Sequence, residues 1–240
     1  MPEVSLRQRR IIAVVAVGAV AVTLAAWAFT YTPVFHAHQI RVLGAQTLRP
    51  DAVRELAGVD GSTNVVHLDT EAVVGRLLAD PWIASASVQR DLPATLVLRI
   101  VERRPVARIT AMGATTILAS DGSALPAVGA PVDLPEMHAA LGAPDDAQRR
   151  AAAALLSALD PVVTHRLDSV TVGQDGVVTL TLRDGVTVDA GVAGDEQAKA
   201  DALRGILRWA ATGSRYLEAV DISAPAAPSA TLANGSSVTP

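Results

Sequence analysis

The sequence predicts an α+β protein with an N-terminal transmembrane helix, then a β-α-α-β-β module and a strand-rich β domain with two helices. Three observations predict this class. An uncharged apolar segment lies near the N-terminus, strand and helix patterns alternate over 35–103, and the apolar runs after Pro105 are short and separated by turn residues. The expected divisions are a cytoplasmic tail at 1–10, a transmembrane helix at 11–31, the first module at 35–103, the β domain at 104–223 and a disordered tail at 224–240.

Composition excludes several classes of protein. The chain has 240 residues, of which 50% are hydrophobic and 18% charged, so most of it should fold. The formal net charge of −4 and the pI near 5.7 offer no basic surface for nucleic acid. Cysteine is absent, which rules out disulfides, thiolate metal sites and cysteine nucleophiles.

The apolar segment from Ile11 to Phe29 predicts a membrane-spanning helix. It carries no charge, and at about 1.5 Å per residue it matches the roughly 30 Å hydrocarbon core of a bilayer. Trp27 and Tyr31 fall where an interfacial aromatic belt lies. Arginines precede the span at positions 7, 9 and 10, so the positive-inside rule places the N-terminus in the cytoplasm and the rest outside.

A cleaved signal peptide is the alternative interpretation of this segment. The arginines would then form the n-region, and Ala26-Trp27-Ala28 matches the A-x-A cleavage pattern. The apolar stretch is long for a signal peptide, and a tryptophan inside the cleavage motif is unfavourable. We therefore favour the anchor.

Residues 35–103 carry an ordered series of strand and helix signals. Gly44 stops the first strand, Pro50 suits the first turn of a helix, Gly58 follows that helix, and Asp69 can cap a second one. The expected elements are strands at His38–Leu43, Trp82–Gln89 and Thr95–Glu102, helices from Pro50 to Gly58 and from Asp69 to Pro81, a short extended piece at Val65–Leu68, and a hairpin turn at Asp91-Leu92-Pro93. This order fits one sheet covered by two helices.

The region after the hinge at Arg103-Arg104-Pro105 is richer in strands. Asp184-Gly185 is the strongest hairpin signal of the chain, and Asp145 or Asp146 can cap a helix. The expected elements are strands at Val106–Ile109, Thr115–Leu118, Val170–Val172, Val177–Leu182, Val186–Asp189 and Leu217–Ile222, one helix that runs through Ala158 and is closed by Pro161, and a second helix after Asp195.

No pattern of residues indicates catalysis. The sequence lacks G-x-S-x-G, a P-loop, G-x-G-x-x-G before a helix, H-E-x-x-H and S-x-x-K. His36 and His38 have no further ligand at a recognisable spacing, so a polar stalk explains them better than a metal site. Asp145-Asp146 suits a helix start better than paired catalytic carboxylates. We predict no catalytic residue, no metal ligand and no cofactor.

Three strings carry a resemblance to a known family. Ile40–Ala45, Asn64–Asp69 and Pro81–Ala107 resemble the polypeptide-transport-associated (POTRA) domain of the FtsQ/DivIB cell-division family. In the third string the matching positions are Pro81, Val88, Arg90, Leu92-Pro93, Leu96 and Val101-Glu102-Arg103-x-Pro105. The resemblance extends to about residue 225, and the cytoplasmic tail is shorter than in many relatives.

The last predicted strand is a candidate partner-binding site. A terminal strand often lies at a sheet edge, where a partner strand can add, although packing alone also explains such a strand. The resemblance implies that this region binds FtsB, itself paired with FtsL. Carried over by position, the binding residues are Val220, Asp221, Ile222, Ser223, Ala224 and Pro225, without the aromatic anchors of some relatives.

Two functional hypotheses follow from these observations. The favoured one, which rests on the resemblance, is a non-enzymatic single-pass scaffold of the divisome in the bacterial inner membrane at the septum, with FtsB/FtsL-like coiled-coil proteins as partners. The alternative is a secreted protein, released after Ala28, that acts as a hydrolase or ligand-binding module. An outer-membrane transport component is a weaker idea, because the chain has no long series of barrel strands.

Overall fold

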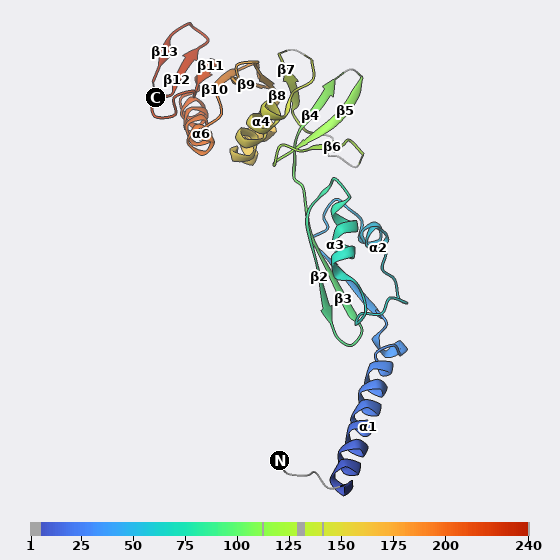
Figure 1. The fold of residues 1–240 in the computed structure, drawn as a ribbon. Helices are drawn as coiled ribbons and strands as arrows, with labels where there is room; N and C mark the ends of the chain where they lie inside the picture. Colours follow the sequence, from blue (N-terminus) through green and yellow to red (C-terminus); the bar gives the residue numbers. More distant parts are fainter. Residues whose placement is uncertain (1–5, 112, 129–132, 141, 240) are drawn as a thin grey trace. The chain divides into compact units, whose positions relative to one another are not determined.

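The computed structural model describes residues 6–111, 113–128, 133–140 and 142–239, and it confirms the α+β class. The chain divides into two compact units, which we call the N-terminal unit (Met1–Glu102) and the C-terminal unit (Arg103–Pro240). Figure 1 shows their elements. Residues 1–5 of the expected cytoplasmic tail lie outside the described residues.

The N-terminal unit begins with helix α1 (Leu6–Phe29). Within the described ranges it is the one helix long and apolar enough to cross a membrane, over Ile12–Phe29, and none of that stretch is buried against the protein. Its large apolar side chains are exposed on all sides, which an aqueous surface helix with one apolar stripe would not show. This arrangement fits a helix whose surroundings are lipid.

The end of α1 is joined to the following module through polar and aromatic contacts. The ring of Tyr31 stacks on that of His67 at 4.0 Å, and the hydroxyl of Thr30 lies 2.8 Å from Nε2 of His67. The amide of Asn64 donates to the carbonyl of Thr30 at 2.8 Å. The expected extended piece at Val65–Leu68 is a turn instead, because the Oδ1 atom of Asn64 accepts from the next backbone N–H groups and folds the chain back.

A three-stranded sheet in the order β1-β3-β2 forms the module, with β1 parallel and β2 antiparallel to β3. Leu96, Leu98 and Ile100 of β3 are buried, as the alternation predicts. Their face packs against the buried side chains of the two helices. The bounds are β1 Gln39–Leu43, α2 Pro50–Ala57, α3 Thr70–Leu78, β2 Ile83–Asp91 and β3 Thr95–Glu102, with a 3₁₀ turn, η1, at Pro33–Phe35.

Local chemistry sets the ends of these helices. Pro50 opens α2, and Gly58 ends it in the left-handed conformation with φ of 63°. The Asp69 carboxylate accepts from two backbone N–H groups at the start of α3. The Arg76 guanidinium of α3 donates twice to the carbonyl of Ala57, at 2.8 and 2.6 Å, and ties the helices together.

One ten-stranded sheet runs through the C-terminal unit in the order β13-β12-β11-β10-β9-β8-β7-β4-β5-β6. Three of its pairings are parallel, namely β4 with β7, β7 with β8 and β10 with β11. The strand bounds are β4 Pro105–Ala111, β5 Ala114–Ala119, β6 Ala124–Pro126, β7 Glu136–Ala139, β8 Leu167–Val172, β9 Val178–Leu182, β10 Thr187–Gly191, β11 Leu217–Asp221, β12 Ser229–Leu232 and β13 Ser237–Val238.

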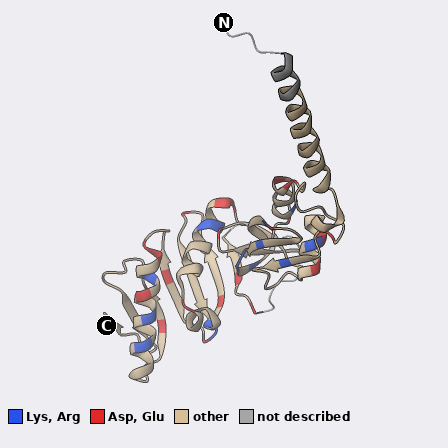
Figure 2. Ribbon diagram, turned by 90° about the horizontal axis from the view of Figure 1, so that it is seen from below, with Lys and Arg blue, Asp and Glu red and all other residues tan. Residues whose placement is uncertain are grey.

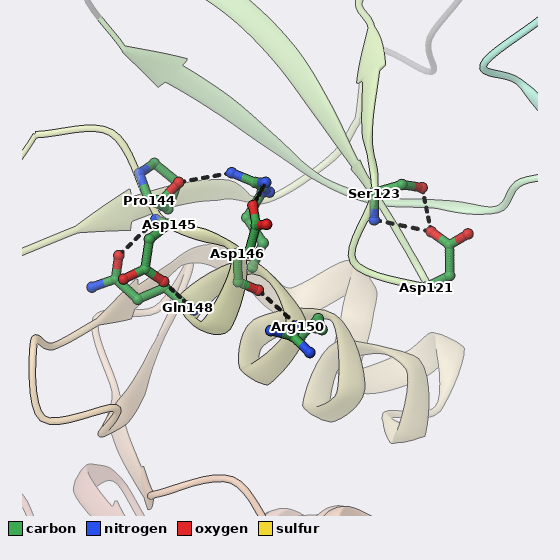
Figure 3. Close-up of polar contacts among 8 residues, drawn as sticks. Asp121, Ser123, Pro144, Asp145, Asp146, Gln148 and Arg150 are labelled. Atoms are coloured by element: carbon green, nitrogen blue, oxygen red, sulfur yellow. Dashed lines mark hydrogen bonds and ion pairs between the residues drawn. The ribbon is translucent and has the colours of Figure 1, made fainter.

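The C-terminal unit also contains three helices, α4 (Asp146–Ala158), α5 (Pro161–Arg166) and α6 (Glu196–Thr212). Asp145 and Gln148 form a capping box at the start of α4, with hydrogen bonds of 2.8 and 3.0 Å (Figure 3). The predicted stop at Pro161 is instead the first residue of α5, because proline suits that position and the Asp160 carboxylate caps the helix. Apolar side chains of α4 and α6 share one core with β8, β9 and β10.

The prediction that residues 224–240 are disordered is wrong, because this segment contains β12 and β13. β12 pairs with β11 over four positions, from Leu217↔Leu232 to Asp221↔Ser229, and β13 pairs with β12. Ala230 is 1% exposed and belongs to the core. Composition suggests disorder here, but backbone hydrogen bonds to an existing sheet offset the entropy of ordering a small polar segment.

Asp121, in the turn before β6, gives the C-terminal unit a stability that depends on pH. Burial alone would raise the pKa of Asp121, but hydrogen bonds from Ser123 and the nearby Arg103 guanidinium lower it to about 2 (Figure 3). A lowered pKa stabilises the fold above the ordinary value of 3.8, and this contribution disappears as the pH falls toward 2.

We expect Asp121→Asn to destabilise the C-terminal unit at pH 7 by about 1 kcal/mol, because solvent screens this half-exposed pair. The measurement is urea unfolding of the full chain with Trp209 as its sole tryptophan, since Trp27 and Trp82 lie in the N-terminal unit. The difference from the parent should shrink as the pH falls toward 2. A difference that does not vary with pH would contradict the assignment.

Candidate partner-binding surface

The last strands of the ten-stranded sheet form the candidate surface. β11 lies between two neighbours: Val220 pairs with Val188 of β10 on one side and with Ala230 of β12 on the other. Both backbone edges of β11 are therefore occupied. The prediction that this strand is an exposed terminal edge is wrong, because β12 follows it and adds to the same sheet.

The predicted binding residues divide by burial. Val220 and Ile222 are 2% and 0% exposed, and their side chains lie in the core. Asp221 is exposed, but its Oδ1 atom accepts hydrogen bonds from the backbone N–H and the hydroxyl of Ser223, at 2.8 and 2.7 Å. The backbone N–H of Ile222 donates to the carbonyl of Asp189 at 2.8 Å, so this stretch is tied to β10.

The other predicted residues begin the connection from β11 to β12. Ser223 and Ala224 are exposed and Pro225 is half-buried. The backbone N–H of Ala227 donates to the carbonyl of Ala224 at 3.0 Å and closes a turn. Three of the six positions, Asp221, Ser223 and Ala224, are therefore available on the surface.

The outer edge of the sheet is the β12–β13 hairpin. β13 pairs with β12 over two positions, Ala230↔Val238 and Thr231↔Ser237. The hydroxyl oxygens of Thr231 and Ser237 lie 3.5 Å apart on one face. A two-residue strand thus lies along a four-residue strand, and its own far edge faces no other strand among the described residues.

A local sequence signal for this hairpin is present. Asn-Gly is a strong hairpin dipeptide, and Asn234-Gly235 forms the turn, with Gly235 at φ of 81°. The Oδ1 atom of Asn234 accepts from the backbone N–H of Ser236 at 3.0 Å. Flanking Ala, Pro and Ser residues hide the signal, because they lack the alternating apolar pattern that identifies strands.

Other candidate residues have structural roles. His36 forms an isolated antiparallel bridge with Asn64, and Asp145 caps α4. Within the ranges that the structure describes, no group of three or more His, Cys, Asp or Glu side chains is placed to hold a metal ion. Of the features predicted from the sequence, the end of the ten-stranded sheet, formed by β11, β12 and β13, is therefore the candidate functional surface.

Comparison with known proteins assigns the chain to a family. Residues 35–103 match the family model described as POTRA domain, FtsQ-type, and residues 107–223 match the model for the C-terminal part of cell division protein FtsQ/DivIB. Cell division protein FtsQ of Streptomyces collinus is 32% identical over 236 residues, which cover 92% of this chain and 88% of that protein. The chain belongs to the FtsQ/DivIB family.

Other members of the FtsQ/DivIB family show how much of each protein is shared. FtsQ of Mycolicibacterium smegmatis is 32% identical over 198 residues, covering 82% of this chain, and this chain spans 58% of that protein's length. The extracytoplasmic domain of DivIB from Geobacillus stearothermophilus is a solved structure with 22% identity and a TM-score of 0.35, covering 46% of this chain and 92% of that one. Family membership supports a role in bacterial cell division, and no comparison supports the secreted-protein alternative.

Proposed function

We propose that this protein is a non-enzymatic, single-pass scaffold of the divisome, which recruits and links division proteins at the septum. Membership of the FtsQ/DivIB family supports the division role, and α1 supports the anchor. In this proposal the arginines at positions 7, 9 and 10 hold the N-terminus in the cytoplasm, and both the sheet-bearing parts lie outside the inner membrane. The proposed partners are FtsB/FtsL-like coiled-coil proteins.

The proposed means of recruitment is strand addition at β12. The observation that carries it is the small overlap of the outermost hairpin, in which β13 covers two residues of β12. A partner strand that replaced β13 would regain those backbone hydrogen bonds and could add further ones along β12. Main-chain pairing would supply affinity, and side chains on alternate positions would supply specificity.

The surface-exposed members of the predicted site have a place in this proposal. Asp221, Ser223 and Ala224 lie at the start of the connection that leads into β12. We assign them contacts with the partner segment that flanks the added strand. Val220 and Ile222 are assigned no partner contact, because their buried side chains pack in the core.

A reversible lock on β13 tests this proposal. The chain has no cysteine, so Thr231→Cys with Ser237→Cys introduces the sole thiols, at positions whose hydroxyl oxygens are 3.5 Å apart. Oxidation should hold β13 on β12 and lower the affinity of the full chain, in lipid nanodiscs, for the FtsB/FtsL-like complex of the same organism by about tenfold or more. Reduction should restore it.

The matched control is a lock far along the same sheet. Thr110→Cys with Thr115→Cys joins the paired strands β4 and β5, and its oxidation should leave the affinity unchanged. If the oxidised Thr231/Ser237 variant binds the complex as tightly as the reduced one, strand exchange at β12 is wrong. Binding through the flanking residues would then be tested with Asp221→Arg and Ala224→Arg.

A further inference from the structure

A groove between α5 and α6 lies beside the turn that joins β9 and β10. Two adjoining cavities of about 190 and 290 Å³ form it, and both are lined by Arg166, Leu207 and Ala211. We call this feature the α5–α6 groove. Nothing in the proposed strand exchange at β12 uses it.

The floor of the α5–α6 groove is apolar. Val163 and Leu207 are buried beneath it, while Val162 at its mouth is 72% exposed. Tyr216, which lines the other cavity, is 82% exposed. Exposed apolar side chains beside an apolar depression are typical of protein-binding surfaces. Tyrosine is also one of the residues that most often contribute strongly to binding at protein interfaces.

The rim of the groove carries an excess of positive charge. Arg166 pairs with Asp184 at 2.6 Å, and Arg204 pairs with Asp160 at 2.6 Å. Two further arginines, Arg208 and Arg215, complete the lining. Asp201 also pairs with Arg204, at 3.2 Å, so four cations and three anions leave the groove with a net charge of about +1, although the chain as a whole carries −4. Figure 2 marks the basic positions along α6 in blue.

The two additional arginines are free to meet an incoming anion. Arg208 is exposed on α6, and its guanidinium has no hydrogen bond or ion pair within the described part of the chain. Arg215 is held in position, because its guanidinium stacks on the Trp209 ring at 4.2 Å and donates to the Trp209 carbonyl at 3.0 Å. Neither has a carboxylate partner among the described residues.

We propose that the α5–α6 groove binds an acidic protein segment that inserts an aliphatic side chain over Leu207 and pairs its carboxylates with Arg208 and Arg215. Charge complementarity selects an acidic partner, and the apolar floor selects one with an aliphatic anchor. The groove is thus a second docking surface, distinct from β12.

The test uses the full chain in nanodiscs of phosphatidylcholine and two fluorescein-labelled peptides, LLEELLEELLEE and its glutamine counterpart LLQQLLQQLLQQ. Fluorescence anisotropy measures their affinities. We expect the glutamate peptide to bind at least about tenfold more tightly than the glutamine peptide, and added salt to weaken it. The double variant Arg208→Glu with Arg215→Glu should lower its affinity by about tenfold or more.

Control variants separate the groove from general electrostatics and from misfolding. Arg150→Glu makes one charge reversal on α4 of the same unit, at an exposed arginine outside the groove, and should leave the affinity within about twofold. Arg208→Glu alone, which removes no contact, should keep the parent's circular dichroism and still weaken binding. Val162→Asp should weaken binding through the apolar part of the site.

Two results would overturn the proposal. The first is equal loss of affinity in Arg150→Glu and Arg208→Glu, which would show general attraction to a charged domain. The second is binding of the parent to phosphatidylglycerol vesicles, lost in Arg208→Glu with Arg215→Glu, without binding of the glutamate peptide; the groove would then recognise an anionic lipid surface. These assays change no residue of β12 or β13. A negative result here would therefore leave the strand-exchange proposal unaffected, and a negative result there would leave this one unaffected.

Discussion

We expect Gly44→Ala to destabilise the N-terminal unit by about 3 kcal/mol or more. Gly44 follows β1 with φ of 88°, in the left-handed region that an alanine adopts only with strain. A Cβ atom built there would lie 2.0 Å from the backbone carbonyl oxygen of Ile100, which β3 holds in place. Since neither backbone can move without breaking the pairing of β1 with β3, the clash and the strain add.

The measurement is urea unfolding of the full chain with Trp82 as the sole tryptophan, because Trp82 is buried in this unit. Gly75→Ala is the matched control. It makes the same change within α3, where no atom lies within 4 Å of the new Cβ, and should stabilise the unit by up to about 1 kcal/mol. An unfolding midpoint for Gly44→Ala equal to that of the parent would show that the loop can move away from β3.

The sequence identifies Gly44 as the end of a strand, but not its contact with Ile100. The same limit recurs across the fold. Ends of helices are set by chemistry within a few residues, and the signals at Gly58, Asp69 and Asp145 predict α2, α3 and α4 correctly. Strand β3 is predicted over its observed range because its alternation spans eight residues.

Elements that depend on distant partners are the ones the sequence does not reveal. β7 is four residues long and forms because β4 and β8 offer free edges on either side of it. β12 and β13 form because β11 presents an edge, and neither has a strong pattern of its own. Short strands of this kind are stabilised mainly by backbone pairing with their neighbours, which the periodicity of their own side chains does not predict.

The candidate site shows the same division between local and distant information. Val220 of β11 and Ile222, which follows β11, are two residues apart and both are buried, as the alternation of an extended chain requires. Whether β11 lies at an edge depends on what the next residues do. The outer end of the sheet is therefore the β12–β13 hairpin, and the exposed residues Asp221, Ser223 and Ala224 lie at the start of the connection from β11 to β12.

Glu102, the last residue of β3, supports the second prediction of large effect. Its carboxylate accepts three backbone hydrogen bonds, from Gln46 at 2.8 Å, Thr47 at 2.8 Å and Leu48 at 2.9 Å. The loop between β1 and α2 is thereby fastened to the end of β3. We expect Glu102→Ala to cost about 2–3 kcal/mol of unfolding free energy, because three donors lose a charged acceptor at once.

Hydrogen exchange followed by mass spectrometry measures this effect where it arises. Amides 46–48 should lose protection in Glu102→Ala, whereas Glu55→Gln, which removes an exposed carboxylate on α2, should leave them unchanged. Glu102→Gln keeps the shape and one acceptor oxygen, so its loss should be smaller than that of alanine. Unchanged protection of these amides in Glu102→Ala would show that water replaces the carboxylate without cost.

The stability that Glu102 gives to the N-terminal unit depends on pH, and the direction of this dependence follows from the shift in its pKa. Burial alone would raise the pKa of Glu102, but the backbone N–H groups of Leu48, Gln46 and Thr47 outweigh it and lower the pKa below the ordinary 4.5. The folded state therefore binds this proton less readily than the unfolded state. The stabilisation is complete above about pH 4.5 and is lost as the pH falls through the lowered value. Glu102→Gln should abolish this part of the acid sensitivity of the N-terminal unit, because an amide does not titrate and the donors at 46–48 then have the same acceptor at every pH.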